Sequence, residues 1–256
     1  MTAVAATGTV LPRSIAGVPR ADRDLCRPLP ETASHVIWDW NGTLLDDARV
    51  VIAATTAAFG RAGITVTVTE ESYRRNFTRP IRLFYERLLG RPVAPEEWVR
   101  LDHAFHGEYQ RLSAGCRLSA GAVEALELIG RRGWTQSVCS MLPEPYLLPA
   151  VEGHGLGGYF VRVDGLTGGE RGGTKAGHLV AHLGRLGAAP DRTVMIGDTV
   201  DDAVAAQEAG VGCLLLDGGA GLHTSDALAS AGVPVVASLA EAMELLLTPD
   251  SAVPRP

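Results

Sequence analysis

The chain has 256 residues, of which 46% are hydrophobic and 20% charged, as is typical of a globular protein with one sizeable domain or a core domain plus a small insert. The formal net charge of −6 gives no reason to expect nucleic acid or an anionic membrane as a partner, and no apolar run approaches the roughly 18 residues needed to span a bilayer. The four cysteines are widely spaced and form no Cys-x-x-Cys pair, which disfavours a zinc site or a disulfide framework and favours a cytoplasmic location.

Both ends of the chain lack the periodicity of helices and strands. The first 34 residues contain Pro12, Pro19, Pro28 and Pro30, and their positive charges follow the apolar stretch, which is the wrong order for a secretory signal. We therefore expect an extended or disordered extension over residues 1–34 and a tail over residues 248–256.

Short apolar runs alternate with helical patterns through most of the remaining chain. This alternation predicts an α/β fold in which crossover helices connect a parallel sheet. The expected strands are residues 36–39, 135–140, 159–163, 193–197, 212–216 and 233–236. The expected helices are residues 120–132, 144–152, 176–186, 201–209 and 239–247. Together they predict a core domain formed by residues 35–45 and 120–247.

The pattern changes between residues 46 and 119, where strand signals are weak and amphipathic helical stretches dominate. We expect helices over residues 47–62, 70–76, 80–89 and 95–113. The sequence thus predicts a small helical domain inserted after the first strand.

Residues suited to chemistry follow the apolar runs in a fixed order. The first run ends in Asp39, and Asn41, Gly42 and Thr43 follow it. A buried strand that delivers a carboxylate at its carboxyl end, then turns on a glycine, places a nucleophile where open α/β sheets bind ligands. An ordinary strand and turn is the alternative, since Asn-Gly is also a strong turn signal. Ser140 ends the next apolar run.

Two further motifs complete this order. Lys175 follows a glycine-rich stretch and is the only lysine in the chain, so it is a candidate for a role that arginine cannot fill. Asp198 and Asp202 end a predicted strand and begin a helix. With Asp39 they concentrate three carboxylates, whose repulsion is costly without a cation such as the oxygen-preferring Mg²⁺. The alternative is a solvated helix N-terminus, which fits Asp201 well.

These motifs resemble the four signature motifs of the haloacid dehalogenase superfamily, over residues from about 35 to 247. The resemblance implies a Rossmann-like, doubly wound parallel sheet and a helical cap over residues 46–119 that closes over the site and selects the substrate. It also implies a Mg²⁺-dependent phosphatase, monomeric or homodimeric, that acts on a small phosphorylated metabolite. Asp39 would be the nucleophile that forms an aspartyl phosphate.

The resemblance also implies a set of metal ligands. Asp39 and Asp198 would bind Mg²⁺ directly, the backbone carbonyl of Asn41 would add a third ligand, and Asp202 would act through water.

Contacts to the substrate are expected from several elements. Ser140 would donate a hydrogen bond to the phosphoryl group and Lys175 would contribute a point charge. Backbone N–H groups at Gly42 and Thr43 would cradle phosphate. In the insert, Arg79 either reaches a phosphate or carboxylate on the substrate or is an ordinary surface arginine.

The seven histidines form no convincing site. His103 and His106, like His178 and His182, have helix-face spacings, but without a third ligand we expect these side chains to be solvated.

One position departs from the superfamily pattern. Most of its phosphatases carry a second Asp two residues after the nucleophile, which protonates the leaving group and later activates water. Here the residue is Asn41, which offers a hydrogen bond but cannot shuttle protons, although some relatives resembling phosphoglycolate phosphatase share this motif. Three alternatives stay open: a phosphatase that is slow or uses another proton donor, an acyl-phosphate-cleaving enzyme or phosphotransferase, and a catalytically impaired phosphate-binding protein. The intact acids, serine and lysine favour the first.

Overall fold

The computed structural model describes residues 29–167, 174–218 and 222–248. Most of the expected N-terminal extension, all but the first residue of the expected tail, and the glycine-rich stretch before Lys175 lie outside the described residues. Residues 29–34 of the expected extension pack against the core. The Ser34 N–H donates to the carbonyl of Arg192 (2.9 Å), and Ala33 is buried.

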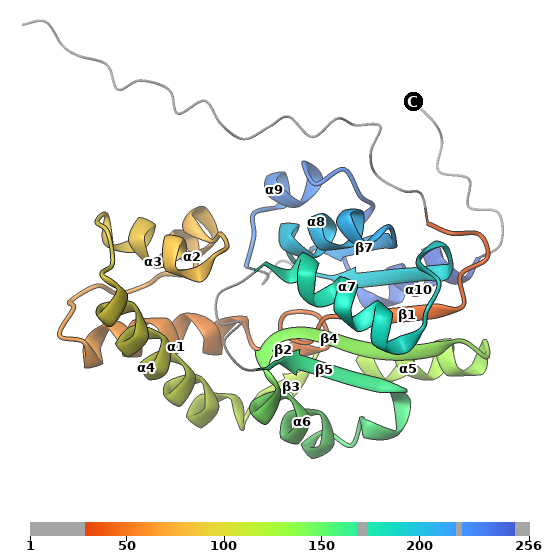
Figure 1. The fold of residues 1–256 in the computed structure, drawn as a ribbon, viewed down its shortest axis with the longest axis horizontal. Coiled ribbons are helices and arrows are strands. Elements are labelled where there is room, and N and C mark those ends of the chain that lie inside the picture. The colour runs from red at the N-terminus through yellow and green to blue at the C-terminus, as the bar shows by residue number, and fades with distance from the viewer. Residues whose placement is uncertain (1–28, 168–173, 219–221, 249–256) are drawn as a thin grey trace, which may run out of the picture.

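The core is a six-stranded parallel sheet in the order β5-β4-β1-β6-β7-β8 (Figure 1). Its strands are β1 (His35–Trp38), β4 (Thr135–Pro143), β5 (Arg162–Leu166), β6 (Thr193–Gly197), β7 (Gly212–Leu216) and β8 (Val235–Val236). From β1 the chain builds outward through β4 and β5, then returns to the other side of β1 for β6, β7 and β8. The strand order therefore reverses between β1 and β6, and the carboxyl ends at such a switch point form a ligand-binding crevice.

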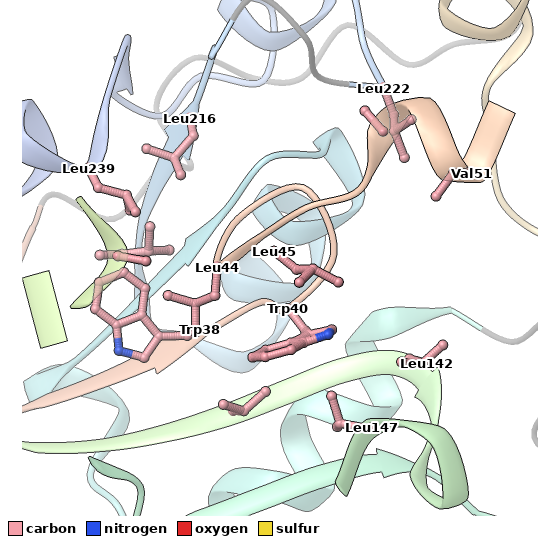
Figure 2. Close-up of a cluster of buried hydrophobic side chains, with 14 of the residues drawn as sticks. Trp38, Trp40, Leu44, Leu45, Val51, Leu142, Leu147, Leu216, Leu222 and Leu239 are labelled. Carbon is pink, nitrogen blue, oxygen red and sulfur yellow. The ribbon is translucent and has the colours of Figure 1, made fainter. Parts of the chain in front are cut away.

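Helices cover both faces of the sheet because successive side chains of a strand point to opposite faces. The helices are α5 (Ala122–Arg131), α6 (Glu144–Gly153), α7 (Lys175–Leu186), α8 (Val200–Ala209), α9 (Ser225–Ala229) and α10 (Leu239–Leu247). Val36 and Trp38 of β1 pack in one hydrophobic cluster with α5, α6 and α10, whereas Ile37 packs in the other with α7 and α8. Figure 2 shows Trp38 and Trp40 of the first cluster among leucines of the sheet and helices.

The insert after β1 consists of four helices that lie together beside the sheet (Figure 1). They are α1 (Ala48–Arg61), α2 (Glu70–Asn76), α3 (Ile81–Leu89) and α4 (Pro95–Ser113). An antiparallel ribbon of β2 (Leu45–Asp46) and β3 (Arg117–Leu118) joins the insert to the core. The sequence does not reveal this ribbon, because two-residue strands are too short to show alternation. The predicted fold class, a doubly wound parallel sheet with a helical insert after the first strand, is confirmed.

One strand is displaced from its predicted position. The sequence predicts a strand over residues 159–163, whereas β5 runs over Arg162–Leu166 and a 3₁₀ turn occupies Gly157–Tyr159. Pairing with β4 decides the register, since Val163 aligns with Val138, and the apolar Phe160 packs against the core before the strand begins.

Among the described residues, no helix has both the length and the apolar character that crossing a membrane requires.

A chain of buried polar side chains starts at the amino end of the sheet. His35 Nδ1 lies 2.7 Å from the Thr135 hydroxyl, and His35 Nε2 lies 2.8 Å from the Ser137 hydroxyl. The same Ser137 oxygen lies 2.8 Å from His182 Nε2, and His182 Nδ1 lies 2.7 Å from Asp164 Oδ2. The expectation of a solvated His182 is therefore wrong, because the parallel sheet and α7 enclose it.

The order Ser137, His182 and Asp164 is that of a serine hydrolase triad, but its burial favours a structural role. The side chains of Ser137 and His182 are fully buried, and the serine hydroxyl is shared with a second histidine. Burial acts to raise the pKa of Asp164, but hydrogen bonds from Arg162, His182 and Arg185 outweigh it and lower this pKa to about 2. His178, also expected to be solvated, is buried on the same helix.

This network predicts a pH-dependent contribution to stability. Burial lowers the pKa of both His35 and His182 to about 4. Stability from such a histidine is complete above about pH 6.5, where the unfolded chain is also neutral, and is lost as the pH falls towards 4. We expect His182→Asn to remove one of these titrations. Between pH 4 and 6.5, the unfolding free energy of the wild type should then rise relative to the variant by roughly 1.4 kcal/mol per pH unit.

Urea unfolding at a series of pH values measures this difference. The wild type must be compared with His182→Asn because buried carboxylates at the carboxyl end of the sheet titrate in the same pH range. Their effect on the pH dependence of the unfolding free energy has the opposite sign. His103→Asn changes an exposed histidine on α4 and serves as the control. Parallel profiles for wild type and His182→Asn would contradict the prediction.

Candidate active site

Asp39 lies at the carboxyl end of β1, beside the point where the strand order reverses. Its N–H donates to the carbonyl of Ile196 on β6 (2.9 Å), which continues the ladder past the strand end and fixes the backbone. The N–H of Trp40 donates to Asp39 Oδ1 (2.8 Å), and the Nζ of Lys175 lies 2.8 Å from the same oxygen. The carboxylate is thus held by the backbone on one side and by a cation on the other.

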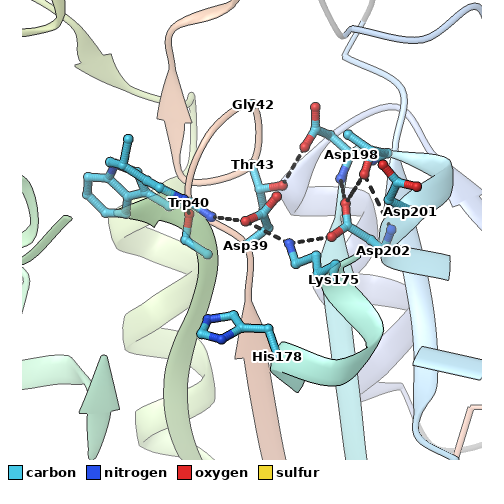
Figure 3. A network of polar contacts seen from close by, with 12 residues as sticks. Asp39, Trp40, Gly42, Thr43, Lys175, His178, Asp198, Asp201 and Asp202 are labelled. Atoms are coloured by element: carbon cyan, nitrogen blue, oxygen red, sulfur yellow. Dashed lines mark hydrogen bonds and ion pairs between the residues drawn. The ribbon is translucent and has the colours of Figure 1, made fainter. Parts of the chain in front are cut away.

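Lys175 bridges two carboxylates from different parts of the sheet. It is the first residue of α7, is almost completely buried, and forms ion pairs with both Asp39 and Asp202 (Figure 3). Burial opposes its charge, but the two carboxylates outweigh burial and hold the pKa of Lys175 above its ordinary value. The side chain is therefore a fixed, compact positive charge between the two carboxylates.

The loop between β6 and α8 brings two more aspartates to this point. Asp202 Oδ2 accepts hydrogen bonds from the N–H of Asp198 (3.2 Å), the N–H of Thr199 (2.9 Å) and the Thr199 hydroxyl (2.7 Å). A Cβ on Gly197 would lie 2.4 Å from the carboxyl carbon of Asp202, so only glycine allows this close approach. Sequence and turn geometry together therefore position both carboxylates.

Asp39, Asp198 and Asp202 form a group that fits a divalent cation. One oxygen from each lies within 4.8 Å of the others. Asp198 Oδ2 is buried without a hydrogen-bond partner, which is costly for a carboxylate oxygen. Burial and then Asp39 raise the pKa of Asp198 well above its ordinary value, and burial raises that of Asp39 to about 6. A cation between these two acids offsets their cost, and carboxylate oxygens are ligands that Mg²⁺ prefers.

The bonds of Asp202 suit it to positioning rather than to direct metal contact. Burial acts to raise its pKa, but Lys175 and the hydrogen bonds from Thr199 hold it below its ordinary value. Its two oxygens already serve these partners. This is compatible with the indirect role that the family resemblance implies for Asp202.

Ser140 reaches the same site from β4. The register of β4 against β5 shifts between Cys139 and Pro143, and such irregularities re-aim side chains near active sites. The Ser140 hydroxyl oxygen accepts the N–H of Leu142 (3.1 Å), which leaves its own proton for another acceptor. Together with Asp39 and Lys175, Ser140 lines a cavity of about 140 Å³ between the sheet and the helical insert.

Arg79 approaches this cavity from the insert and forms an ion pair with the core. Its Nε lies 3.1 Å from Asp201 Oδ2, and the side chain is 19% exposed. Thr199 caps α8, and Asp201 occupies its first turn. The partner of Arg79 in this structure is thus a core carboxylate, and the ion pair connects the insert to the core.

Gly42 and Thr43 both lie against Asp198, and the N–H of Gly42 is not free for the predicted phosphate cradle. The Gly42 N–H is already occupied by Asp47 Oδ1 (3.0 Å) and the carbonyl of Leu45 (2.9 Å). Gly42 has a φ of 75°, and a Cβ there would lie 2.2 Å from Asp198 Oδ2, so both conformation and space require glycine. The buried Thr43 hydroxyl donates to Asp198 Oδ1 (3.3 Å). Both residues therefore position Asp198.

The Asn41 side chain is held by two residues that the sequence does not single out. Its Nδ2 donates to Asp47 Oδ2 (2.6 Å) and to the Tyr109 hydroxyl (2.6 Å), and Tyr109 donates to the same Asp47 oxygen (2.7 Å). Burial raises the pKa of Asp47. An amide at position 41 has a physical reason here, because it donates to Asp47 where a carboxylate would repel it.

Asp47 and Tyr109 escape detection from sequence for different reasons. Asp47 precedes a predicted helix, where Asp is common as an N-cap, yet its side chain makes no capping hydrogen bond. Tyr109 lies on α4, far along the chain, and nothing in its local pattern links it to Asn41. The tertiary contact between insert and core is what brings them together.

Comparison with known proteins decides the family. A model of haloacid dehalogenase-like hydrolases matches residues 33–210, a segment that contains all of the motif residues described above. The chain belongs to this family of hydrolases. The hydrolase is 28% identical over 215 residues to a protein of Dickeya dadantii (strain 3937) named probable phosphatase IndB, with 78% of this chain and 87% of that protein covered. It is also 28% identical over 192 residues to the phosphoglycolate phosphatase of Agrobacterium fabrum, with 72% and 79% covered.

Solved structures share the fold of the hydrolase. A predicted phosphatase from Clostridium acetobutylicum matches it with a TM-score of 0.74 at 19% identity, covering 84% of this chain and 98% of that one. At this identity the likeness speaks for the fold and not for the substrate.

The contact between Asn41 and Asp47 predicts the outcome of exchanging the two residues. Asn41→Asp places a carboxylate against that of Asp47, so we expect it to destabilise the hydrolase by roughly 1–3 kcal/mol near neutral pH. The double variant Asn41→Asp/Asp47→Asn again pairs one amide with one carboxylate and should recover most of this loss. Urea unfolding of the wild type, both single variants and the double variant gives the coupling free energy. If the losses in unfolding free energy of the two single variants simply add in the double variant, the contact between residues 41 and 47 does not contribute to stability.

Proposed function

We propose that the hydrolase is a Mg²⁺-dependent phosphatase that cleaves the phosphate monoester of a small metabolite through an aspartyl phosphate on Asp39. The observation that carries this proposal is the position of Lys175 between Asp39 and Asp202, beside a buried and unpartnered oxygen of Asp198. Asp39 and Lys175 line a cavity at the switch point of the sheet. The names of the relatives, phosphatases in both cases, support the same reaction class.

Phosphoryl transfer needs an aligned nucleophile and balanced charge more than covalent help from the protein. Asp39 is aligned by the ladder between β1 and β6. Lys175 would supply fixed positive charge at the nucleophile, and the Ser140 hydroxyl would donate a hydrogen bond to a phosphoryl oxygen. Mg²⁺, held by Asp39, Asp198 and the carbonyl of Asn41, would supply further positive charge to the phosphoryl oxygens.

The proposed reaction has two steps. A carboxylate oxygen of Asp39 attacks phosphorus while the bond from phosphorus to the alcohol oxygen breaks, and the alcohol leaves with that electron pair. Asn41 cannot give a proton, so the leaving oxygen takes one from water. Water then attacks phosphorus, the bond to Asp39 breaks, and inorganic phosphate leaves with release of one proton, which restores the balance.

The amide at position 41 favours one alternative reaction on the same fold. A leaving group that is stable as an anion, such as the carboxylate of an acyl phosphate, needs no proton from position 41. Cleavage of an acyl phosphate, or transfer of its phosphoryl group to another acceptor, is therefore the second candidate. The third, a phosphate-binding protein with impaired catalysis, is weakened because Asp39, Ser140 and Lys175 all line one cavity.

Asp39→Asn tests the nucleophile. We expect this variant to lose Mg²⁺-dependent phosphate release while keeping its fold, since the change is isosteric and removes a buried charge. Beryllium fluoride with Mg²⁺, which mimics the aspartyl phosphate, should raise the thermal unfolding temperature of the wild type and not of Asp39→Asn. EDTA should abolish activity, and Mg²⁺ should restore it.

The exposed Asp191, in a turn before β6, provides the matched control. Asp191→Asn makes the same chemical change away from the site and should behave as the wild type in every assay. Sustained turnover by Asp39→Asn, or full activity in the presence of EDTA, would overturn the proposed mechanism.

The exchanged variant Asn41→Asp/Asp47→Asn tests how the leaving group is protonated. A carboxylic acid at position 41 should accelerate alkyl phosphates, whose leaving groups need a proton, by roughly 10²–10⁴-fold. Aryl phosphates, with more acidic alcohols, should gain much less. The measurement is kcat/KM of the wild type and of the exchanged variant on phosphate esters whose alcohols differ stepwise in acidity. An equal gain throughout, or no gain at all, would show that position 41 is not where protonation is missing.

A further inference from the structure

The cavity beside Asp39 has an aromatic wall. Seven of the residues that line it are aromatic, and all seven come from the helical insert. The chain contains four tryptophans, five tyrosines and five phenylalanines, so half of its aromatic residues line this one cavity. That concentration is the observation from which the substrate class can be argued.

The rings of the wall contact one another, three pairs of them edge to face and two stacked. Phe84 lies with its ring centroid 4.6 Å from Tyr73 and 5.5 Å from Phe77. Trp98 meets Tyr85 at 5.6 Å with an interplanar angle of 73°. Such contacts hold each ring in a fixed orientation, so the wall is formed before a ligand arrives.

Packing of the insert alone does not explain this wall. Phe84 and Tyr85 are almost as completely buried as Phe59, but they line the cavity, whereas Phe59 packs against Tyr85 without lining it. The other rings border unfilled space that also contacts Asp39 and Lys175. On the core side, the apolar Leu142 continues the lining. The reacting groups thus open directly onto an aromatic and aliphatic chamber.

The charges around the chamber are already paired. Among the described lining residues, the permanent cations are Arg79 and Lys175, and each faces core carboxylates. The remaining acid–base pair of the described lining is Asp102 with His106, at 3.4 Å. A second anionic group on the substrate, such as the carboxylate of phosphoglycolate, would therefore find no unpaired cation among these residues.

We propose that the alcohol part of the substrate carries a single uncharged aromatic ring, bound against this wall while its phosphoryl group meets Asp39 and Lys175. This inference rests on the proposed phosphatase function. The volume suits one ring, since an engineered apolar cavity of about 150 Å³ takes up one benzene molecule, and the chamber measures about 140 Å³.

Benzyl phosphate and ethyl phosphate test the ring directly. Their alcohols differ little in acidity, so a difference in kcat/KM reports binding of the ring and not the ease with which the alcohol leaves. With the full chain and Mg²⁺, we expect benzyl phosphate to be favoured by about 10- to 100-fold, the range given by burial of a phenyl-sized group. 2-Phosphoglycolate should be a poorer substrate than benzyl phosphate. Ethyl phosphate or 2-phosphoglycolate turned over as well as benzyl phosphate would overturn the proposal.

Matched variants locate the preference in the cavity. Phe105→Leu shortens an aromatic residue of the wall, and Phe160→Leu makes the same change in the core domain, at a residue that does not line the cavity. The ratio of benzyl to ethyl turnover should fall several-fold in Phe105→Leu and remain unchanged in Phe160→Leu. Ile81→Trp, which fills the chamber from a partly exposed position on α3, should depress benzyl turnover and spare ethyl turnover. An unchanged ratio in both wall variants would refute the assignment.

Phosphonates separate this inference from the proposed function. Benzylphosphonate and ethylphosphonate cannot be hydrolysed, so their effect on the thermal unfolding temperature measures binding alone. Benzylphosphonate should stabilise the protein more at equal concentration, and Phe105→Leu should reduce that advantage. Absence of turnover on every ester would count against the phosphatase function, while the phosphonates would still decide whether the cavity binds a ring. Equal shifts from the two phosphonates would exclude ring binding.

Discussion

The ion pairs of Lys175 with Asp39 and Asp202 are the interaction on which the rest of the site depends. Three carboxylates are buried within a few ångströms of each other, an arrangement that is unfavourable unless positive charge lies among them. The lysine balances two of the acids and leaves Asp198 with an unpartnered oxygen. These three buried acids with a single lysine are a group that could hold a metal ion, because a cation would offset the negative charge that Lys175 leaves uncompensated.

The parallel sheet explains why these groups meet although they are far apart in sequence. Asp39 ends β1 and Asp198 follows β6, and these strands are neighbours at the point where the strand order reverses. Lys175 begins the helix that precedes β6, on the face formed by Ile37 and Met195. Close backbone approach then adds precision, because Gly42 and Gly197 leave no room for a side chain beside the acids. The site is a consequence of topology first and of side-chain contacts second.

The helical insert is bound to this site by polar contacts as well as by packing. Arg79 pairs with Asp201 beside the acid cluster, and Tyr109 joins Asp47 and Asn41 in a closed triangle. Asn41 therefore belongs to the joint between insert and core, which gives an amide at this position a structural purpose. The same joint brings the aromatic wall against the reacting groups. An alcohol that carries an aromatic ring would suit the aromatic wall. Where the ring makes that alcohol more acidic, its departure would also depend less on a proton donor at position 41, which suits Asn41.

The sequence by itself determined the fold class, because apolar runs of strand length alternate with helical periods, and a parallel sheet follows from that order. It also singled out Asp39, Ser140, Lys175 and the aspartates after β6, because the ends of apolar runs and a single lysine can be recognised directly in the sequence. The tertiary structure alone decided what depends on contacts between distant segments. The partners of Asn41, the burial of His182 and the lining of a cavity by aromatic side chains leave no local pattern. The backbone of Gly42, which the motif assigned to phosphate, is instead bonded to Asp47, because that carboxylate is brought against it by the ribbon that joins insert and core.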